Sequence, residues 1–184
     1  SLDSNFKSKV MNALFAAGTL RIYKKNPVLA KTSAAKEELR QLGVPHAVIA
    51  PVGLDNAVLK KNIPADEKMR LRKEHGFEAD DVILCNVSRL SWEKRPLELI
   101  DLFLQVKGKK KFKLIIVGNG PLEEELNEKI RKNGLEKEVK IYPNVPYEKM
   151  WEIYEMSDYY LNMNKGEIFG MAIMEAVYYK TSVA

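Results

Sequence analysis

Two glutamates near the end of the sequence stand where acidic side chains are unexpected. Residues 168–179 carry a single charge, that of Glu175, in a pattern that predicts a largely buried helix. Burying an unpaired carboxylate costs several kcal/mol, a large part of a protein's net stability. Glu167 lies eight residues earlier, just before a Phe169-Gly170 pair that could begin the helix. Carboxylate oxygens accept hydrogen bonds from hydroxyl groups, so the pair favours a site for a hydroxyl-rich ligand. The alternative is one glutamate that caps its own helix and another paired with a lysine.

Two cations form a second candidate group. Arg89 and Lys94 lie five residues apart in the segment Ser88–Pro96, which follows the apolar run 82–87. A guanidinium offers a planar fork of donors to a phosphate, and an ammonium adds a point charge. With the free amides of a helix start nearby, such a loop could hold a diphosphate without a metal ion. Taken alone, the pair is better explained by a solvated loop.

A glycine-containing turn, Gly118-Asn119-Gly120-Pro121, follows the apolar run that ends at Val117. No third glycine follows at the spacing of a dinucleotide fingerprint, and no Lys-Ser or Lys-Thr pair completes a P-loop. What remains is a tight turn whose small residues let a ligand or a neighbouring loop approach the backbone. A purely structural turn is an equally good interpretation.

The elements that would position these residues alternate regularly from residue 80 onward. The patterns predict four units of a strand followed by a helix, and Ser182–Ala184 resemble the opening of a further strand. Such repeats with right-handed crossovers indicate a doubly wound, Rossmann-like parallel sheet of the α/β class. Such a sheet binds ligands at the carboxyl ends of its strands, near the point where strand order reverses. The predicted ranges are strands 81–87, 112–117, 138–142 and 158–162 and helices 96–107, 121–133, 147–156 and 170–179.

The first 79 residues are less regular. Apolar residues spaced three to four apart, from Phe6 to Ala17, predict a basic helix that could pack on a neighbouring domain or lie on a membrane surface. Short strands at 28–33 and 47–51 flank a helix at 34–42, and the polar stretch 55–64 is interpreted as a linker before a helix at 65–74. At its other end the sequence stops mid-pattern, so truncation within a domain is expected.

Composition limits the possible classes of protein. Residues 1–50 hold eight Lys/Arg against three acids, so they carry the whole net charge of +5. Cys85 is the single cysteine and lies in an apolar run, which excludes a disulfide framework and favours a cytoplasmic setting. The basic N-terminal segment could add a peripheral contact with a membrane. His46 and His75 have no partners at metal-ligand spacing and are interpreted as surface or turn residues. No metal or cofactor is expected. Trp151 and Tyr154 are interpreted as packing residues.

Four segments together resemble the group 1 glycosyltransferases, which transfer sugars from nucleotide-sugar donors and have two facing Rossmann-like domains, the GT-B fold. The resemblance covers about the last 150 residues, from Val28 onward. It lies in the order and spacing of Gly43-Val44-Pro45 with Pro51–Asp55, Val87–Leu90 with Lys94, Val117–Pro121, and Glu167–Gly170 with Glu175-Ala176.

The resemblance implies a role for each candidate. Arg89 and Lys94 would hold the donor diphosphate, and Glu175 would accept hydrogen bonds from the ribose. Glu167 would face the transferred sugar, and residues 142–146 would border the nucleobase. Gly118 and Gly120 would contribute the glycine turn, and the amides of Phe169, Gly170 and Met171 would reach phosphate or sugar. Glu167, Arg89 and Lys94 would be the catalytic set, in a reaction that retains anomeric configuration and needs no metal.

The resemblance also implies a domain division. Residues 1–54 would be the tail of an N-terminal acceptor domain and the crossover, 55–79 a linker and connecting helix, and 80–184 the donor domain. The partners would be a nucleoside-diphosphate sugar and an unknown acceptor, and nucleic acid is not expected. Since the acceptor loops would be missing, this chain alone is expected to be inactive.

The sequence departs from the family pattern at three places. Met163-Asn164 replace a usual Pro-Ser pair, Ile168 replaces a usual Gly, and Lys180-Thr181-Ser182 replace a Gly-x-Pro. Two alternatives to the transferase stay open: a non-catalytic Rossmann-like nucleotide-binding or interaction module, and a nucleotide-sugar epimerase on the same double fold.

Overall fold

The computed structural model describes residues 2–55, 59–60, 62–108, 110–164 and 170–184, with side chains from residue 12 onward. The chain divides into two compact units, Ser1–Gly53 and Leu54–Ala184. Each unit has its own packing and is described separately.

The first unit is small and has little core. Its elements are α1 (Leu2–Tyr23), β1 (Leu29–Ala30), α2 (Ser33–Gln41) and β2 (Val48–Ile49), and the two strands pair in parallel. Thr32 begins α2, because its hydroxyl oxygen accepts a hydrogen bond from the Ala35 amide at 3.0 Å. Among the described side chains, its core cluster consists of Val28, Val44 and Ala47, with Leu20 and Leu39 packed against them. The predicted N-terminal helix is confirmed.

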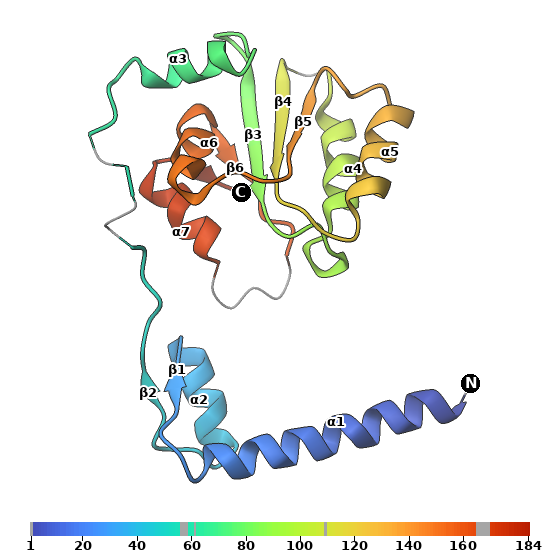
Figure 1. The fold of residues 1–184 in the computed structure, drawn as a ribbon, viewed down its shortest axis with the longest axis vertical. Coiled ribbons are helices and arrows are strands. Elements are labelled where there is room, and N and C mark those ends of the chain that lie inside the picture. Colours follow the sequence, from blue (N-terminus) through green and yellow to red (C-terminus); the bar gives the residue numbers. More distant parts are fainter. Residues whose placement is uncertain (1, 56–58, 61, 109, 165–169) are drawn as a thin grey trace. The chain divides into compact units, whose positions relative to one another are not determined.

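The second unit is a five-stranded parallel sheet with helices on both faces (Figure 1). The strand order is β5-β4-β3-β6-β7. In chain order its elements are α3 (Glu67–Glu74), β3 (Val82–Val87), the 3₁₀ helix η1 (Trp92–Lys94), α4 (Pro96–Val106), β4 (Phe112–Val117), α5 (Glu123–Lys132), β5 (Val139–Tyr142), the 3₁₀ helix η2 (Tyr147–Lys149), α6 (Met150–Met156), β6 (Tyr159–Tyr160), α7 (Met171–Tyr178) and β7 (Ser182–Val183). The predicted alternation of strands and helices is confirmed.

The central strands are buried on both faces because their residues alternate between two cores. Ile83 and Cys85 of β3 pack with α3 and α6 on one face, whereas Leu84 packs with α4 and α5 on the other. Leu114 and Ile115 of β4 divide in the same way. Apolar residues in succession are therefore required here, as is usual for parallel strands covered by helices.

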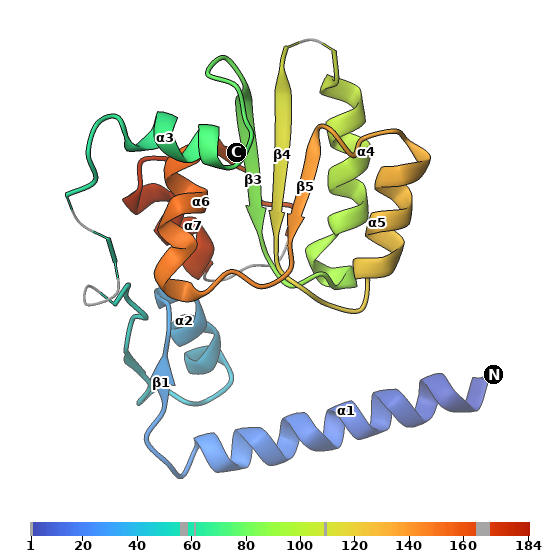
Figure 2. The same ribbon diagram turned by 45° about the horizontal axis from the view of Figure 1, so that its top comes forward.

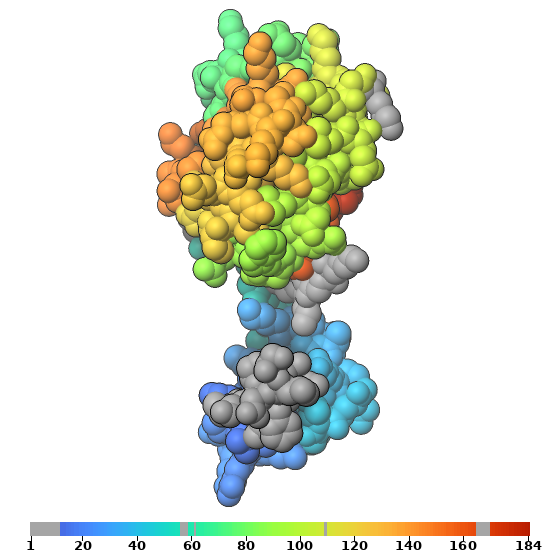
Figure 3. Space-filling model, turned by 90° about the vertical axis from the view of Figure 1, so that its right-hand side faces the viewer, coloured from blue at the N-terminus to red at the C-terminus, as the bar shows by residue number. Residues whose placement is uncertain are grey.

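The helices of this unit divide between the two faces of the sheet. Figure 2 shows α4 and α5 together on one side of the sheet, and α3, α6 and α7 on the other. Figure 3 looks onto the outer surfaces of α4 and α5, which lie side by side and enclose that side of the unit. Since α3 contributes the buried Leu71 to the same core as β3 and α6, it packs as part of this unit.

Several predicted elements are shorter than expected. In the first unit, the strands predicted at 28–33 and 47–51 are only Leu29–Ala30 and Val48–Ile49. Two elements of the second unit also change at their ends. The predicted helix 147–156 begins as the 3₁₀ helix η2 and becomes an α-helix only at Met150. The predicted strand 158–162 pairs as a strand only at residues 159–160, although the Leu161 amide still donates to the Cys85 carbonyl oxygen at 2.7 Å. In both cases the pattern is correct and the boundary shifts by one to three residues.

Candidate functional site

The strand order reverses between β3 and β6. The chain leaves β3 through α4 towards β4 and β5, and it later returns to place β6 on the opposite side of β3. Loops that follow β3 and β6 diverge from this point, which leaves a crevice at their carboxyl ends. Among the described residues, the candidates after β3 and at the start of α7 belong to this end of the sheet.

A pocket of about 230 Å³ lies at this reversal point. It is formed by the end of β3, the loop that leads to α4, the segment after β6 and the first turn of α7. Amide, hydroxyl and ammonium groups line it together with apolar side chains. The lining residues are Asn86, Val87, Ser88, Lys94, Tyr160, Asn162, Met163, Asn164, Met171 and Ala172.

Asn86 fixes the base of the pocket. Its side-chain amide is buried and donates to the Leu161 carbonyl oxygen at 2.7 Å, which ties β3 to the segment after β6. The Ser88 hydroxyl donates to the Asn86 side-chain oxygen at 2.8 Å. Because its donors and acceptors are satisfied inside the protein, this pair holds the pocket wall in one geometry.

Of the two predicted cations, one lines the pocket. Lys94 ends η1 and is half-buried at the pocket wall, whereas Arg89 is exposed in the same loop and is not part of the lining. The cations of this loop, Arg89, Lys94 and Arg95, outnumber its single acid, Glu93. The loop is therefore electropositive, which favours an anionic group near it.

The glycine turn has a packing function in this structure. A β-carbon on Gly118 would lie 2.0 Å from the Ser88 carbonyl oxygen, and one on Gly120 would lie 2.4 Å from the Leu90 carbonyl oxygen. The Leu90 amide donates to the Asn119 carbonyl oxygen at 2.9 Å across the same contact. The neighbouring loop thus takes the space beside both glycines, and the turn supports the segment that carries Arg89 and Lys94.

The start of α7 faces the pocket through Met171 and Ala172, with Gly170 just before the helix. Glu167 and Phe169, both predicted site residues, lie outside the described residues. The prediction that they meet a ligand here stays a prediction.

Glu175 lies one turn further along α7 and does not line this pocket. Its carboxylate is buried and accepts a hydrogen bond from the Tyr154 hydroxyl at 2.7 Å. It borders a separate small recess lined by Leu59, Tyr147, Met150, Trp151, Tyr154 and Tyr179. Burial raises the pKa of Tyr147, and the negative charge of Glu175 raises it further. The structure therefore separates Glu175 from Lys94 and places it towards η2, beside the loop of residues 142–146.

The recess gives Tyr154 a polar role in addition to packing, which the sequence interpretation missed. No signal in the helical spacing distinguishes a tyrosine that packs from one that also donates to a carboxylate. Asn86 and Asn162 were missed for the same reason, because their position at the pocket depends on which strands become neighbours.

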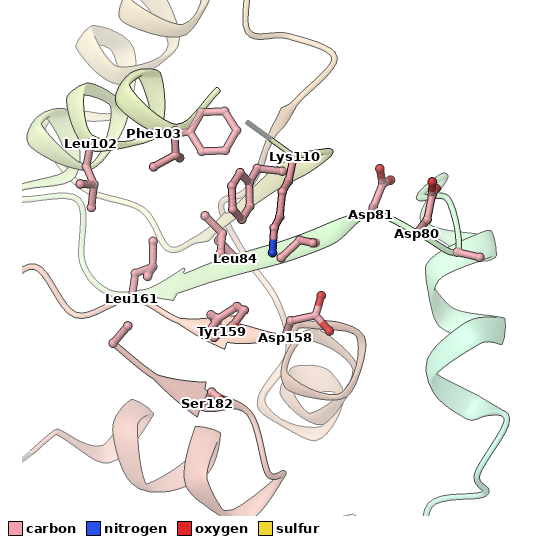
Figure 4. A pocket seen from close by; sticks show the side chains of 15 residues that line it. Asp80, Asp81, Leu84, Leu102, Phe103, Lys110, Asp158, Tyr159, Leu161 and Ser182 are labelled. Carbon is pink, nitrogen blue, oxygen red and sulfur yellow. The ribbon is translucent and has the colours of Figure 1, made fainter. Parts of the chain in front are cut away.

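A larger cavity, of about 700 Å³, lies elsewhere and is mainly apolar (Figure 4). Leu84 and Phe103 line it, as do Asp81 and Asp158, which precede β3 and β6. It therefore reaches the amino ends of those strands, and the Asp158 carboxylate there is already paired with Lys68 and Arg72. Its size alone does not make it the candidate site, since parallel sheets bind ligands at the opposite end.

Within the described ranges, no cluster of three or more His, Cys, Asp or Glu side chains could hold a metal ion. Among the same residues, no helix is both long and apolar enough to cross a membrane.

Residues 67–184, well over half of the chain, match the family of group 1 glycosyl transferases. The chain belongs to this family. This group 1 glycosyltransferase chain is 23% identical over 131 residues to the alpha-monoglucosyldiacylglycerol synthase of Streptococcus pneumoniae, a match that covers 70% of this chain and 30% of that protein. It is 26% identical over 108 residues to the N-acetyl-alpha-D-glucosaminyl L-malate synthase of Bacillus anthracis, covering 59% of this chain and 28% of that protein.

The fold is similar to that of HepE from Anabaena, solved in complex with UDP and glucose. The TM-score is 0.72 at 24% identity, and the match covers 89% of this chain and 47% of the HepE chain. The predicted fold class is thereby confirmed: a Rossmann-like α/β parallel sheet that corresponds to about half of a GT-B structure. The chain spans less than half the length of each of these three relatives.

One of the three departures from the group 1 pattern lies in the pocket wall. Met163 and Asn164, which stand where the family usually has Pro-Ser, both line the pocket at the reversal point. An unbranched thioether and a carboxamide there replace a rigid ring and a small hydroxyl. This part of the pocket therefore differs in shape and hydrogen-bonding capacity from the usual family pattern.

Proposed function

We propose that this group 1 glycosyltransferase chain supplies the donor site for transfer of a sugar from a nucleoside-diphosphate sugar to an acceptor, with retention of anomeric configuration. The observation that carries the proposal is the polar pocket at the reversal point of the sheet, lined by Lys94 and the first turn of α7. HepE, with the same fold, has been solved with UDP and glucose.

In the proposed arrangement the donor extends along the carboxyl end of the sheet. Lys94 and Arg89 neutralise the diphosphate, and the amides at Gly170 and Met171 reach its oxygens or the sugar. Glu175 receives the ribose hydroxyls at the mouth of the recess beside Tyr147, and residues 142–146 border the nucleobase. Preorganised positive charge stabilises the nucleotide as it leaves, and a single such donor is worth about 3 kcal/mol in other enzymes.

The proposed site also includes two residues of the segment 165–169. Glu167 faces the transferred sugar, and Phe169 adds a backbone amide at the start of the helix. Residues 1–54 form the tail of an acceptor domain, residues 55–79 the connection, and residues 80–184 the donor domain. Turnover then requires an acceptor-binding half in addition to this chain.

The proposal is tested by titrating the protein with UDP, GDP and ADP in a calorimeter. We expect one of the three to bind, and Arg89→Ala, Lys94→Ala and Glu175→Ala each to weaken its affinity at least about tenfold, equivalent to about 1.4 kcal/mol. Lys132→Ala is the matched control, because Lys132 pairs with Glu128 on the exposed face of α5, away from the sheet end.

Two results would contradict the proposal. One is the failure of all three nucleotides to bind. The other is unchanged affinity in all three site variants, which would favour a binding module whose carboxylate and cations serve structure alone. Release of nucleoside diphosphate from the matching nucleotide sugar, measured with an acceptor and with a protein that also carries the acceptor-binding half, then distinguishes a transferase from a module that only binds.

A further inference from the structure

Tyr154 of α6 forms a hydrogen bond with one carboxylate oxygen of Glu175. Its side chain is fully buried, and its hydroxyl donates to Glu175 Oε2 at 2.7 Å. A hydrogen bond to an ionised carboxylate is roughly twice as strong as one between neutral groups. The hydrogen bond therefore offsets part of the cost of burying the carboxylate, since the Glu175 residue is only 7% exposed.

Both the ring and the backbone of Tyr154 are held in place. It stacks on Tyr179 with the ring centroids 5.9 Å apart and the planes 9° from parallel. The Tyr154 carbonyl oxygen accepts a hydrogen bond from the Thr181 hydroxyl at 2.9 Å. Because side chain and backbone are both fixed, the hydroxyl has one position from which to reach Glu175.

The protonation state of Tyr154 suits a permanent donor. Burial raises its pKa, and the adjacent Glu175 carboxylate raises it further. The hydroxyl therefore keeps its proton throughout the range in which proteins are folded, and it can only donate to the carboxylate.

We propose that Tyr154 is a positioning residue that holds the Glu175 carboxylate in the orientation from which it accepts hydrogen bonds from the ribose hydroxyls of a nucleotide. The proposal rests on the proposed function, in which Glu175 meets the ribose. Tyr154 does not touch the ligand in this arrangement, since it acts through Glu175. Without the phenol, the carboxylate can turn within its recess and loses the orientation that a diol requires.

The test compares two probes on the protein and on Tyr154→Phe. The first probe is whichever of UDP, GDP and ADP binds most tightly, and the second is its 2′,3′-dideoxy analogue, which lacks both ribose hydroxyls. In Tyr154→Phe we expect affinity for the ribonucleotide to fall about tenfold, as for loss of one hydrogen bond to a charged group. Affinity for the dideoxy analogue should stay unchanged, because that ligand has no hydroxyl for Glu175 to accept from.

Ser157→Ala is the matched control. The Ser157 hydroxyl is also buried and donates to the Ile153 carbonyl oxygen on the same helix at 2.6 Å, but it does not contact Glu175. We expect it to lower thermal stability without changing the ratio of the two affinities. A merely structural role for Tyr154 would give Tyr154→Phe this same result.

The outcomes separate the two proposals. An unchanged ratio in Tyr154→Phe, with the ratio lost in Glu175→Ala, overturns the positioning role and leaves the donor site intact. Failure of the unmodified protein to bind any of the three nucleotides overturns the proposed function itself. If Tyr154→Phe does not fold, Thr181→Val replaces it, since that change removes the hydroxyl that holds the Tyr154 backbone. A reduced ratio in Thr181→Val supports the positioning role, and an unchanged one counts against it.

Discussion

Arg72 and Asp158 form an ion pair of 2.7 Å that joins α3 to the start of β6. The guanidinium is buried and also donates to the carbonyl oxygens of Met156, Ala79 and Asp81. The other carboxylate oxygen of Asp158 pairs with Lys68 at 2.8 Å. A single buried cation thus binds the segments that enter β3 and β6, the two strands whose far ends form the candidate site.

Removing that cation should destabilise the second unit strongly. We expect Arg72→Met to lower the free energy of unfolding by about 3–5 kcal/mol, because three carbonyl oxygens and a carboxylate lose a buried donor. Arg70→Met is the control, since Arg70 pairs with Glu67 and Glu74 on the exposed side of the same helix, where ion pairs add little to stability. Urea unfolding measures both, and equal losses in the two variants would contradict the role given to Arg72.

Asp158 should make stability depend on acidity. Burial acts to raise its pKa, but the hydrogen bonds from Lys68 and the Ile83 amide and the charges of Lys68 and Arg72 outweigh burial, so the pKa is lowered. A carboxyl with a lower pKa in the folded than in the unfolded state stabilises the protein above its unfolded value of about 3.9. That contribution is lost as pH falls through the folded pKa.

The expected result is therefore a difference that depends on pH. Asp158→Asn should be less stable than the unmodified protein above about pH 5, and the two should converge as pH falls below about 4. Unfolding midpoints measured over this range provide the check. Asp80→Asn serves for comparison, because Asp80 pairs with Lys111 at the surface. A difference in stability between Asp158→Asn and the unmodified protein that is the same at all pH values would contradict a lowered pKa for Asp158 in the folded protein.

Gly118 should tolerate no side chain. A β-carbon there would lie 2.0 Å from the Ser88 carbonyl oxygen, so Gly118→Ala must displace the loop that carries Arg89 and Lys94. We expect a loss of more than about 3 kcal/mol of stability, or a folded protein with nucleotide affinity reduced at least about tenfold. Gly53→Ala, where no atom lies within 4 Å of the added carbon, should change stability by at most about 0.5 kcal/mol. Calorimetric unfolding and nucleotide titration distinguish the two positions.

Cys85 should be unreactive while the protein is folded. It is fully buried in β3, and burial raises the pKa of its thiol to about 12, although a hydrogen bond with Ser157 acts in the opposite direction. The thiolate is the reactive form and is scarcely populated at neutral pH. A chromogenic disulfide reagent should therefore label Cys85 only after denaturant is added. Rapid labelling of the native protein would show that β3 opens locally.

The features that could be predicted from the sequence are those encoded over short distances. The apolar run Leu114–Val117 identifies a strand buried on both faces, and strand and helix periods alternate without interruption from residue 80. Gly118 and Gly120 mark a tight turn, and the spacing of the family motifs indicates the group 1 glycosyltransferases. Each signal is local, because periodicity and turn chemistry are properties of a few consecutive residues.

Which of these residues become neighbours in space depends on the tertiary structure. It made β3 and β6 neighbours, and so brought Asn86 to the segment around Asn162. It paired Glu175 with Tyr154 and turned it away from the pocket that contains Lys94. Such partnerships join residues that are far apart in the chain and depend on strand order and on how two helices pack. No local pattern contains that information, since many distant side chains would satisfy the same buried carboxylate equally well.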